Sequence, residues 1–289
     1  MSTPYHQFAA RIAALQEEGR KFPCGGFAPL PRPEVPEDAP RALIFSPHPD
    51  DECIVGGLAL RLLREGRRRV INVAVTLGSN RQRRAGRLAE LREACAYLGF
   101  ELVTSAPDGL SAVTAKSRAE QPDAWREKVD VIAGLLRRHR PELIFLPHER
   151  DWNGTHIGVH HLVRDALAAA GDAAPCLTVE TEFWGAMDDP NLMVELTAEQ
   201  VGALMAATSF HVGEVQRNPY HLLLPAWMQD NVRRGGEVVG GQGGAAPDFT
   251  FATLYRLGRW DGAAWQKLEP ARRFWAAGEA WDEVPPPLS

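Results

Sequence analysis

The sequence predicts an α/β fold with a Rossmann-like, largely parallel sheet flanked by helices. From Ala42 onward, short apolar runs alternate with helical stretches, which is typical of βαβ units. The runs are bounded by polar or glycine-containing loops, and four of them lie between residues 42 and 146. No internal repeat replaces this alternation, so we expect one sheet built from successive strand–helix units.

The expected strands are short and rich in apolar and β-branched side chains, as buried parallel strands are. They cover residues 42–45, 70–76, 101–105, 143–146, 177–183 and 249–257. The expected helices carry apolar residues at helical spacing or end at a glycine. They cover residues 56–66, 84–98, 122–139, 156–170, 197–210 and 222–234, with Thr197 as an N-cap and Gly99 as a C-terminal stop.

The first 40 residues are expected to form an arm. A short helical pattern of Phe8, Ile12 and Leu15 precedes closely spaced prolines between residues 31 and 40, which favour an extended connector. The rest of the chain is expected to form one domain, because its last part looks like an extension packed on the same core. The expected boundaries are an arm at 1–40 and a domain at 41–289, with a core at about 42–215 and an extension at about 216–289.

Composition excludes several classes of protein. The 289 residues are 45% apolar and 24% charged, which is ordinary for a globular chain. A net charge of -5 lacks the basic excess of nucleic-acid-binding proteins, so we expect no nucleic-acid partner. No stretch approaches the roughly 18 apolar residues of a membrane span, and the N-terminal region lacks a secretory apolar segment. We therefore expect a cytoplasmic protein, whose four scattered cysteines form neither a thiolate zinc site nor a disulfide framework.

The most informative segment is Ser-Pro-His-Pro-Asp-Asp-Glu at residues 46–52, directly after the first expected strand. Open α/β sheets place ligand sites at this end of their strands. Neighbouring carboxylates repel one another unless a cation or a proton lies between them, so Asp50, Asp51 and Glu52 point to a bound metal. Acids that complement a helix dipole are the alternative, but they leave His48 between two prolines unexplained.

A second polar stretch, residues 148–161, follows the expected strand at 143–146 and is rich in histidine. In a parallel sheet it emerges at the same edge as the first motif. His156 and His160 lie four residues apart at the start of a helix, so both can face one way. Two histidines and one carboxylate with open coordination positions form the arrangement that a catalytic zinc requires.

The motif at residues 46–52 resembles the PHPDDE signature of the PIG-L/LmbE-like family, metal-dependent deacetylases that act on N-acetylglucosamine-type groups. Residues 87–99 are similar to the family's R-x-x-E-L-x-x-A-x-x-x-L-G helix, and residues 107–110, Pro-Asp-Gly-Leu, resemble the loop that follows it. The resemblance runs from about residue 42 to at least residue 170. It implies a Rossmann-like layered fold, in agreement with the periodicity.

By position, the resemblance implies that His48, Asp51 and His156 bind the metal and that Asp50 is the general base. The expected metal is Zn²⁺, with Fe²⁺ as the alternative. In the family, the second motif usually has the sequence HPDH. When residues 153–156 are aligned with it, Asn153 stands where the family often has a histidine that stabilises the transition state. An asparagine can donate a hydrogen bond to an oxyanion but cannot deliver a proton at neutral pH.

The group that protonates the leaving amine therefore stays open. Candidates are His148, His160 and His211, the last because residues 209–216 faintly resemble a C-terminal segment of the family. We take His160 as the catalytic residue among them. The alternative is that Asp50 returns the proton that it took from water.

The resemblance also implies substrate contacts for Arg87 and Asp108. Each residue has a structural alternative. Arg87 can pair with Glu90 or Glu93 on its own helix, and Asp108 before Gly109 can be a turn residue.

These observations together predict a zinc-dependent hydrolase that releases acetate from a small-molecule N-acetylated sugar or sugar conjugate, with Asp50 activating a zinc-bound water. One alternative is a degenerate family member that binds a sugar conjugate without turning it over, which the asparagine at 153 suggests. The other is a non-haem Fe(II) enzyme, because its facial triad also consists of two histidines and a carboxylate. The βαβ pattern counts against that second alternative.

Overall fold

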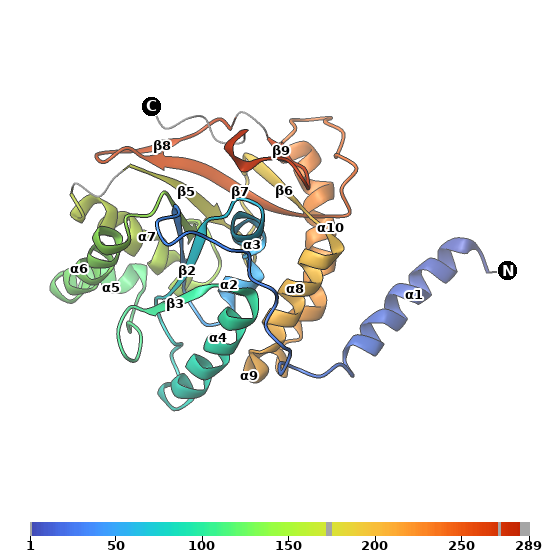
Figure 1. Ribbon diagram of the computed structural model, residues 1–289, viewed down its shortest axis with the longest axis horizontal. Helices are drawn as coiled ribbons and strands as arrows, with labels where there is room; N and C mark the ends of the chain where they lie inside the picture. Colours follow the sequence, from blue (N-terminus) through green and yellow to red (C-terminus); the bar gives the residue numbers. More distant parts are fainter. Residues whose placement is uncertain (1, 172–174, 271–272, 284–289) are drawn as a thin grey trace.

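A computed structural model describes residues 2–171, 175–270 and 273–283. The described residues form a nine-stranded sheet with the order β3-β2-β1-β4-β5-β7-β6-β9, and β8 pairs with β7 (Figure 1). Strands β3, β2, β1, β4 and β5 run parallel to one another, whereas β7 is antiparallel to both β5 and β6. The strands are β1 Arg41–Ser46, β2 Arg69–Ala74, β3 Glu101–Thr104, β4 Leu143–Pro147, β5 Cys176–Thr181, β6 Leu192–Leu196, β7 Phe251–Trp260, β8 Trp265–Lys267 and β9 Phe274–Trp275.

Helices cover both faces of the sheet, so the predicted α/β fold with a largely parallel sheet is confirmed (Figure 1). Side chains alternate along β1: Leu43 and Phe45 join the core beneath the helices at 122–139 and 154–169, while Ile44 joins the core on the opposite face, beneath the helices at 57–64, 84–98 and 198–209. The helices are α1 Pro4–Gly19, α2 Asp51–Ile54, α3 Gly57–Arg64, α4 Arg84–Leu98, α5 Ala115–Glu120, α6 Pro122–His139, α7 Gly154–Ala169, α8 Ala198–Ser209, α9 Val212–Val215 and α10 Tyr220–Val238, with 3₁₀ turns η1 Arg81–Arg83 and η2 Trp281–Glu283.

The helix ends follow the local signals in the sequence. Gly99 ends α4 with φ at 89°, a conformation that favours glycine, and its N–H donates to the carbonyl oxygen of Cys95. The Thr197 side chain accepts from the N–H of Gln200, whose own side chain reaches back to form a capping box at α8. The predicted helix at 56–66 is preceded by one extra turn, α2.

Strand β6 and the antiparallel direction of β7 are absent from the sequence-based prediction. Strand β7, which follows β6 by more than 50 residues in the sequence, inserts between β5 and β6 and becomes an inner strand of the sheet. The domain boundaries expected from the sequence stay a prediction.

Helix α1 extends away from the rest of the molecule, and the chain that follows it returns to the body beside α9 (Figure 1). The C-terminal end of α1 contacts α10, where Nε2 of Gln16 donates to the carbonyl oxygen of Leu222 at 3.1 Å. Within the described ranges, no helix combines the length and apolar character needed to cross a membrane.

Candidate metal centre

The candidate site lies where the chain leaves two neighbouring strands in opposite directions. Strands β1 and β4 pair in parallel, but β1 leads to β2 on one side and β4 leads to β5 on the other. The loops that follow the two strands therefore diverge and leave a crevice at their carboxyl ends, which is the usual ligand site in open α/β sheets. The loop after β1 carries His48 and Asp51, and α7 after β4 carries His156.

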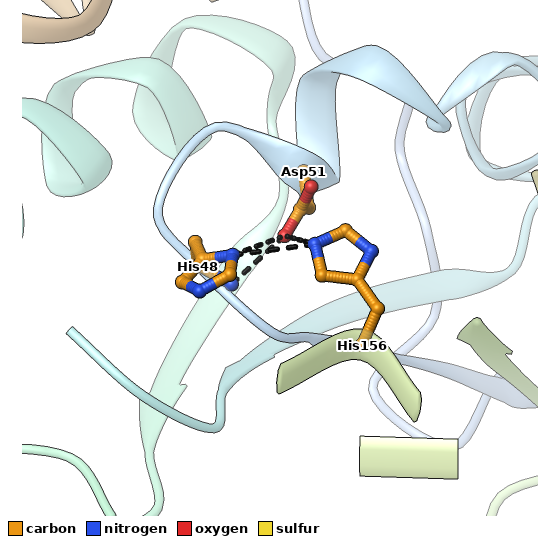
Figure 2. Close-up of side chains that lie close together, drawn as sticks. All are labelled: His48, Asp51 and His156. Atoms are coloured by element: carbon orange, nitrogen blue, oxygen red, sulfur yellow. Dashed lines mark hydrogen bonds and ion pairs between the residues drawn. The ribbon is translucent and has the colours of Figure 1, made fainter. Parts of the chain in front are cut away.

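These three side chains, from here on the metal cluster, point toward one another (Figure 2). Nδ1 of His48 lies 3.2 Å from Nε2 of His156. Oδ2 of Asp51 lies 3.5 Å from the first of these nitrogens and 3.3 Å from the second. Asp51 also accepts the backbone N–H of His48 at 2.8 Å, which fixes the loop around the carboxylate.

The donor set fits a divalent cation. Two imidazole nitrogens that face each other need a proton or a cation between them, and a neighbouring carboxylate strengthens that demand. Oδ2 of Asp151 lies 3.3 Å from Nδ1 of His156, which holds the ring proton on Nδ1 and turns Nε2 toward the cluster. Such a carboxylate–histidine pair is typical of metal ligands.

The electrostatics agree with this arrangement. Burial by itself favours a high pKa for Asp51, but His156 and His48 hold this pKa far below its usual value. Burial also opposes the charged form of His156, yet Asp51 and Asp151 raise its pKa to about 10. The site therefore holds a positive charge that a metal ion can replace.

Asp50 lies at the turn between the strand and α2, in a conformation that is unusual for a residue other than glycine. Its φ is 121°, and its N–H donates to Oε2 of Glu52 at 3.0 Å. Burial and the adjacent Asp51 raise the pKa of Asp50, although His211 and Arg87 oppose the shift. A carboxyl group with a raised pKa beside a metal cluster is suited to accept and release a proton.

Asn153 has two roles in the structure: it caps a helix and it lines a hollow. Its Oδ1 accepts the N–H of Thr155 at 2.8 Å and so caps α7. The residue also lines a hollow of about 340 Å³ together with His48, Thr76 and Arg84. This hollow opens next to the metal cluster and has the size of a small-molecule pocket.

Comparison with protein families adds to this geometry. Residues 43–167 match the family model PIG-L, described as GlcNAc-PI de-N-acetylase, and this range holds both motifs of the site. These matched residues are called the PIG-L domain from here on, after the family model to which they are similar. Comparison with curated protein sequences finds no significant match.

Solved structures share the fold of this PIG-L domain at low sequence identity. The N,N'-diacetylchitobiose deacetylase from Pyrococcus horikoshii superposes with a TM-score of 0.51 at 15% identity, covering 91% of this chain and 94% of its own. The hydratase GalB from Pseudomonas putida KT2440 superposes with a TM-score of 0.54 at 17% identity, covering 75% of this chain and 95% of its own. A zinc-inhibited form of the teicoplanin deacetylase Orf2 superposes with a TM-score of 0.51 at 17% identity, covering 76% of this chain and 99% of its own. The fold alone does not select a reaction, since a hydratase and deacetylases share it.

Within the PIG-L domain, the structure places His160 apart from the metal cluster. Its Nδ1 lies 2.9 Å from the carbonyl oxygen of Pro147 and 3.4 Å from Oε1 of Glu180. Burial lowers the pKa of His160 to about 4, so the ring is neutral at pH 7. None of the described interactions joins His160 to the metal cluster. The catalytic role that the sequence suggests for His160 stays a prediction.

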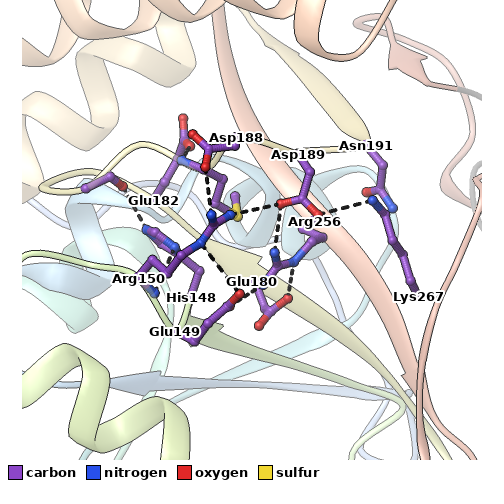
Figure 3. A network of polar contacts seen from close by, with 12 residues as sticks. His148, Glu149, Arg150, Glu180, Glu182, Asp188, Asp189, Asn191, Arg256 and Lys267 are labelled. Atoms are coloured by element: carbon purple, nitrogen blue, oxygen red, sulfur yellow. Dashed lines mark hydrogen bonds and ion pairs between the residues drawn. The ribbon is translucent and has the colours of Figure 1, made fainter.

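The cluster around His160 is an ion-pair network. Arg256 bridges the carboxylates of Glu149, Glu180 and Asp189, and Figure 3 shows these contacts. His148 belongs to the same region, where its Nε2 lies 2.9 Å from the carbonyl oxygen of Gly185. Arg150 also pairs with Glu149 and Asp189, and Lys267 pairs with Asp189, so cationic side chains already compensate these carboxylates and the network does not need a metal ion.

Among the described contacts, Arg87 pairs with other groups than Glu90 or Glu93, and the substrate contact predicted for it stays a prediction. Its Nη2 donates to the carbonyl oxygen of Pro49 at 2.9 Å and lies 3.8 Å from Oδ1 of Asp50. Its Nε lies 3.7 Å from Oε1 of Glu214. Arg87 therefore supports the loop that carries Asp50, and Arg84 lines the hollow instead.

Asp108 is exposed at the turn that precedes Gly109. Gly109 has φ of 66°, and a Cβ atom there would lie 2.9 Å from the backbone nitrogen of Leu77. Glycine is thus needed at 109 for close packing of the loop, which agrees with the turn alternative for Asp108. The substrate contact predicted for Asp108 stays a prediction.

Proposed function

We propose that the PIG-L domain is a metal-dependent N-deacetylase that removes an acetyl group from an N-acetylglucosamine-type substrate. The observation that carries this proposal is the meeting of His48, Asp51 and His156 with the protonatable carboxyl of Asp50 at one crevice. The deacetylases among the structural neighbours support it. Zn²⁺ is the proposed metal, since two imidazoles and one carboxylate with open positions suit catalytic zinc.

His48, Asp51 and His156 would hold the zinc ion, which would supply Lewis acidity to a carbonyl oxygen and to water. Asp50 accepts the proton of the attacking water. The Nδ2 hydrogens of Asn153 are the donors that this side chain can offer to a developing oxyanion, because its Oδ1 caps α7. Asp50 then returns the proton to the leaving amine, so the reaction needs no contribution from His160.

The substrate is proposed to enter the hollow beside His48 and Asn153, whose volume of about 340 Å³ suits one sugar unit. Trp152 is 82% exposed next to Asn153 and offers a flat ring to the apolar face of a sugar. Arg84 and Ser111 line the hollow itself and offer polar groups to the substrate. A soluble N-acetylated sugar or sugar conjugate in the cytoplasm is the proposed substrate.

The test is acetate release from a panel of N-acetylglucosaminides by protein whose metal content has been measured. Asp50→Asn is expected to keep the metal and to lower the rate by about 10²- to 10⁴-fold, the usual worth of general acid–base catalysis. His156→Ala is expected to lose both metal and activity. Asp123→Asn, an exposed acid on α6, is the matched control and should behave as the parent protein.

Two results contradict parts of this proposal. Equal release by the parent and Asp50→Asn removes Asp50 from the reaction. Metal-loaded protein that binds an N-acetylated sugar but releases no acetate from any amide instead supports the binding-only alternative suggested by Asn153.

A further inference from the structure

Helix α1 exposes its apolar side chains to water. Tyr5 is 83% exposed, Phe8 66% and Leu15 65%. Of the ten exposed large apolar side chains in the described part of the chain, five lie between residues 5 and 22. A single 16-residue helix is barely stable in water without packing, so this face needs a partner.

The exposed side chains form a narrow seam. Tyr5, Phe8, Ile12 and Leu15 are spaced by three, four and three residues, which is the a-d-a-d pattern of two heptads. A helix that packs on a broad protein surface usually has a wider apolar stripe. A seam of this width fits a second helix.

We propose that α1 docks antiparallel on α1 of a second copy of this chain. If Ile12 packs opposite Leu15 of the second copy, the same contact recurs at the symmetry-related position, as an isologous interface requires. In this register Arg11 lies beside Glu18 of the second copy, and Glu18 beside its Arg11. Both residues are exposed and both flank the seam at g positions, where charges select helix partners.

The same register also brings the free end of each helix to a hollow on the body of the other copy. Tyr5 of one copy reaches the level of Phe22 of the other, just beyond the end of α1. A hollow of about 420 Å³ lies there, lined in part by Phe22, Pro219 and Leu222. The seam therefore continues from the helix onto the body of the second copy.

The charge of α1 favours a second copy of this chain over a membrane surface as its partner. Helix α1 contains one arginine and two glutamates, a formal charge of -1 with His6 neutral. Helices that lie on anionic membranes carry an excess of lysine and arginine on the polar face. Helix α1 lacks that excess.

The test is the mass of the full-length chain measured by light scattering across a range of concentrations. We expect the parent to have twice the 31.8 kDa of one chain and Phe8→Asp to have half the parent mass. Ala10→Asp adds the same charge on the opposite side of α1 and should keep the parent mass. Circular dichroism checks that each variant is folded.

A charge exchange tests the register. Arg11→Glu alone and Glu18→Arg alone are each expected to shift the protein toward a single chain, and the double variant Arg11→Glu/Glu18→Arg should restore the parent mass. A parent that is a single chain overturns the proposal, as does Phe8→Asp that keeps the parent mass. A double variant that stays dissociated overturns the antiparallel register. Binding of the parent to phosphatidylserine vesicles that is lost in Phe8→Asp would assign α1 to a membrane surface instead.

Discussion

Nε2 of His211 lies 2.8 Å from Oε1 of Glu52, and neither side chain is exposed to solvent. The other oxygen of Glu52 accepts the N–H of Asp50, whose φ of 121° is unfavourable for a residue with a side chain. His211 and Glu52 come from segments 159 residues apart, so their contact ties α9 to the loop of the metal centre. This buried pair holds the proposed general base in position.

Glu52→Gln is expected to lower kcat by at least about tenfold while the metal content stays unchanged. The reason is that Gln has one acceptor oxygen, which cannot serve both His211 and the N–H of Asp50. Breaking a buried ion pair also costs about 3–5 kcal/mol, so the midpoint of urea unfolding should fall. Both effects are measured on the same preparation, with Glu93→Gln on the exposed side of α4 as the control.

A Glu52→Gln protein with parent kcat shows that the position of Asp50 does not depend on the pair. Unfolding at the parent midpoint shows that the pair adds nothing to stability.

Asp151→Asn is expected to weaken metal binding by about 10- to 100-fold, the usual effect of removing the carboxylate behind a ligating histidine. The carboxylate lies 3.3 Å from Nδ1 of His156 and selects the tautomer whose Nε2 faces the cluster. An amide can present its NH₂ group to the ring instead and so favour the wrong tautomer. Competition with a zinc chelator measures the affinity.

Asp188→Asn is the matched control for this experiment. Asp188 pairs with Arg150 at the surface, and its side chain is 80% exposed. Exposed pairs contribute little, so zinc affinity should stay at the parent value. Equal affinities in all three proteins would mean that Asp151 does not orient His156.

Local signals explain which parts of the fold the sequence predicts. Helix α4 begins and ends where expected, because its apolar spacing and Gly99 lie within one segment. Strand β6 (Leu192–Leu196) has no such signal beyond a short apolar run, and the direction of β7 depends on neighbours far away in the chain. Strand pairing of this kind is decided by tertiary packing.

The same distinction applies to the candidate site. His48, Asp51 and His156 could be nominated because each lies in a motif directly after a strand. The sequence groups His160 with His156 because the two residues are one helical turn apart on α7. In the structure, the ring of His160 lies beside Glu180 of β5 and not at the crevice. The contact of His211 with Glu52 joins distant segments, and only the third acid of the motif hinted at a role for Glu52.

Metal binding near pH 7 to 9 is expected to release about one proton from the site. The pKa of His156 in the metal-free protein is about 10, against 6.5 when unperturbed, so the ring is protonated in this range and must lose its proton to bind a metal. Apparent zinc affinity should therefore rise with pH until about pH 10. Calorimetric titration in buffers of different ionisation enthalpy counts the protons.

The raised pKa of His156 also makes the stability of the metal-free protein depend on pH. A raised folded-state pKa stabilises the fold below pH 6.5, and this contribution is lost as pH rises through about 10. His156→Gln should remove that part of the pH dependence. Metal binding without proton release would show that His156 is already neutral in the metal-free protein.

Asn153→Asp separates the two roles of this residue. Aspartate caps a helix as well as asparagine does, so the stability of α7 should remain at the parent value. Aspartate has no hydrogen to donate and places a negative charge beside the developing oxyanion, so kcat should fall by about 10²- to 10³-fold, the usual effect of losing one oxyanion donor. Asn153→Ala should lose the donor and also about 1 kcal/mol of stability, because alanine cannot cap the helix. Steady-state acetate release and urea unfolding of both variants distinguish the roles, and a parent-like kcat in Asn153→Asp would assign oxyanion stabilisation to another group.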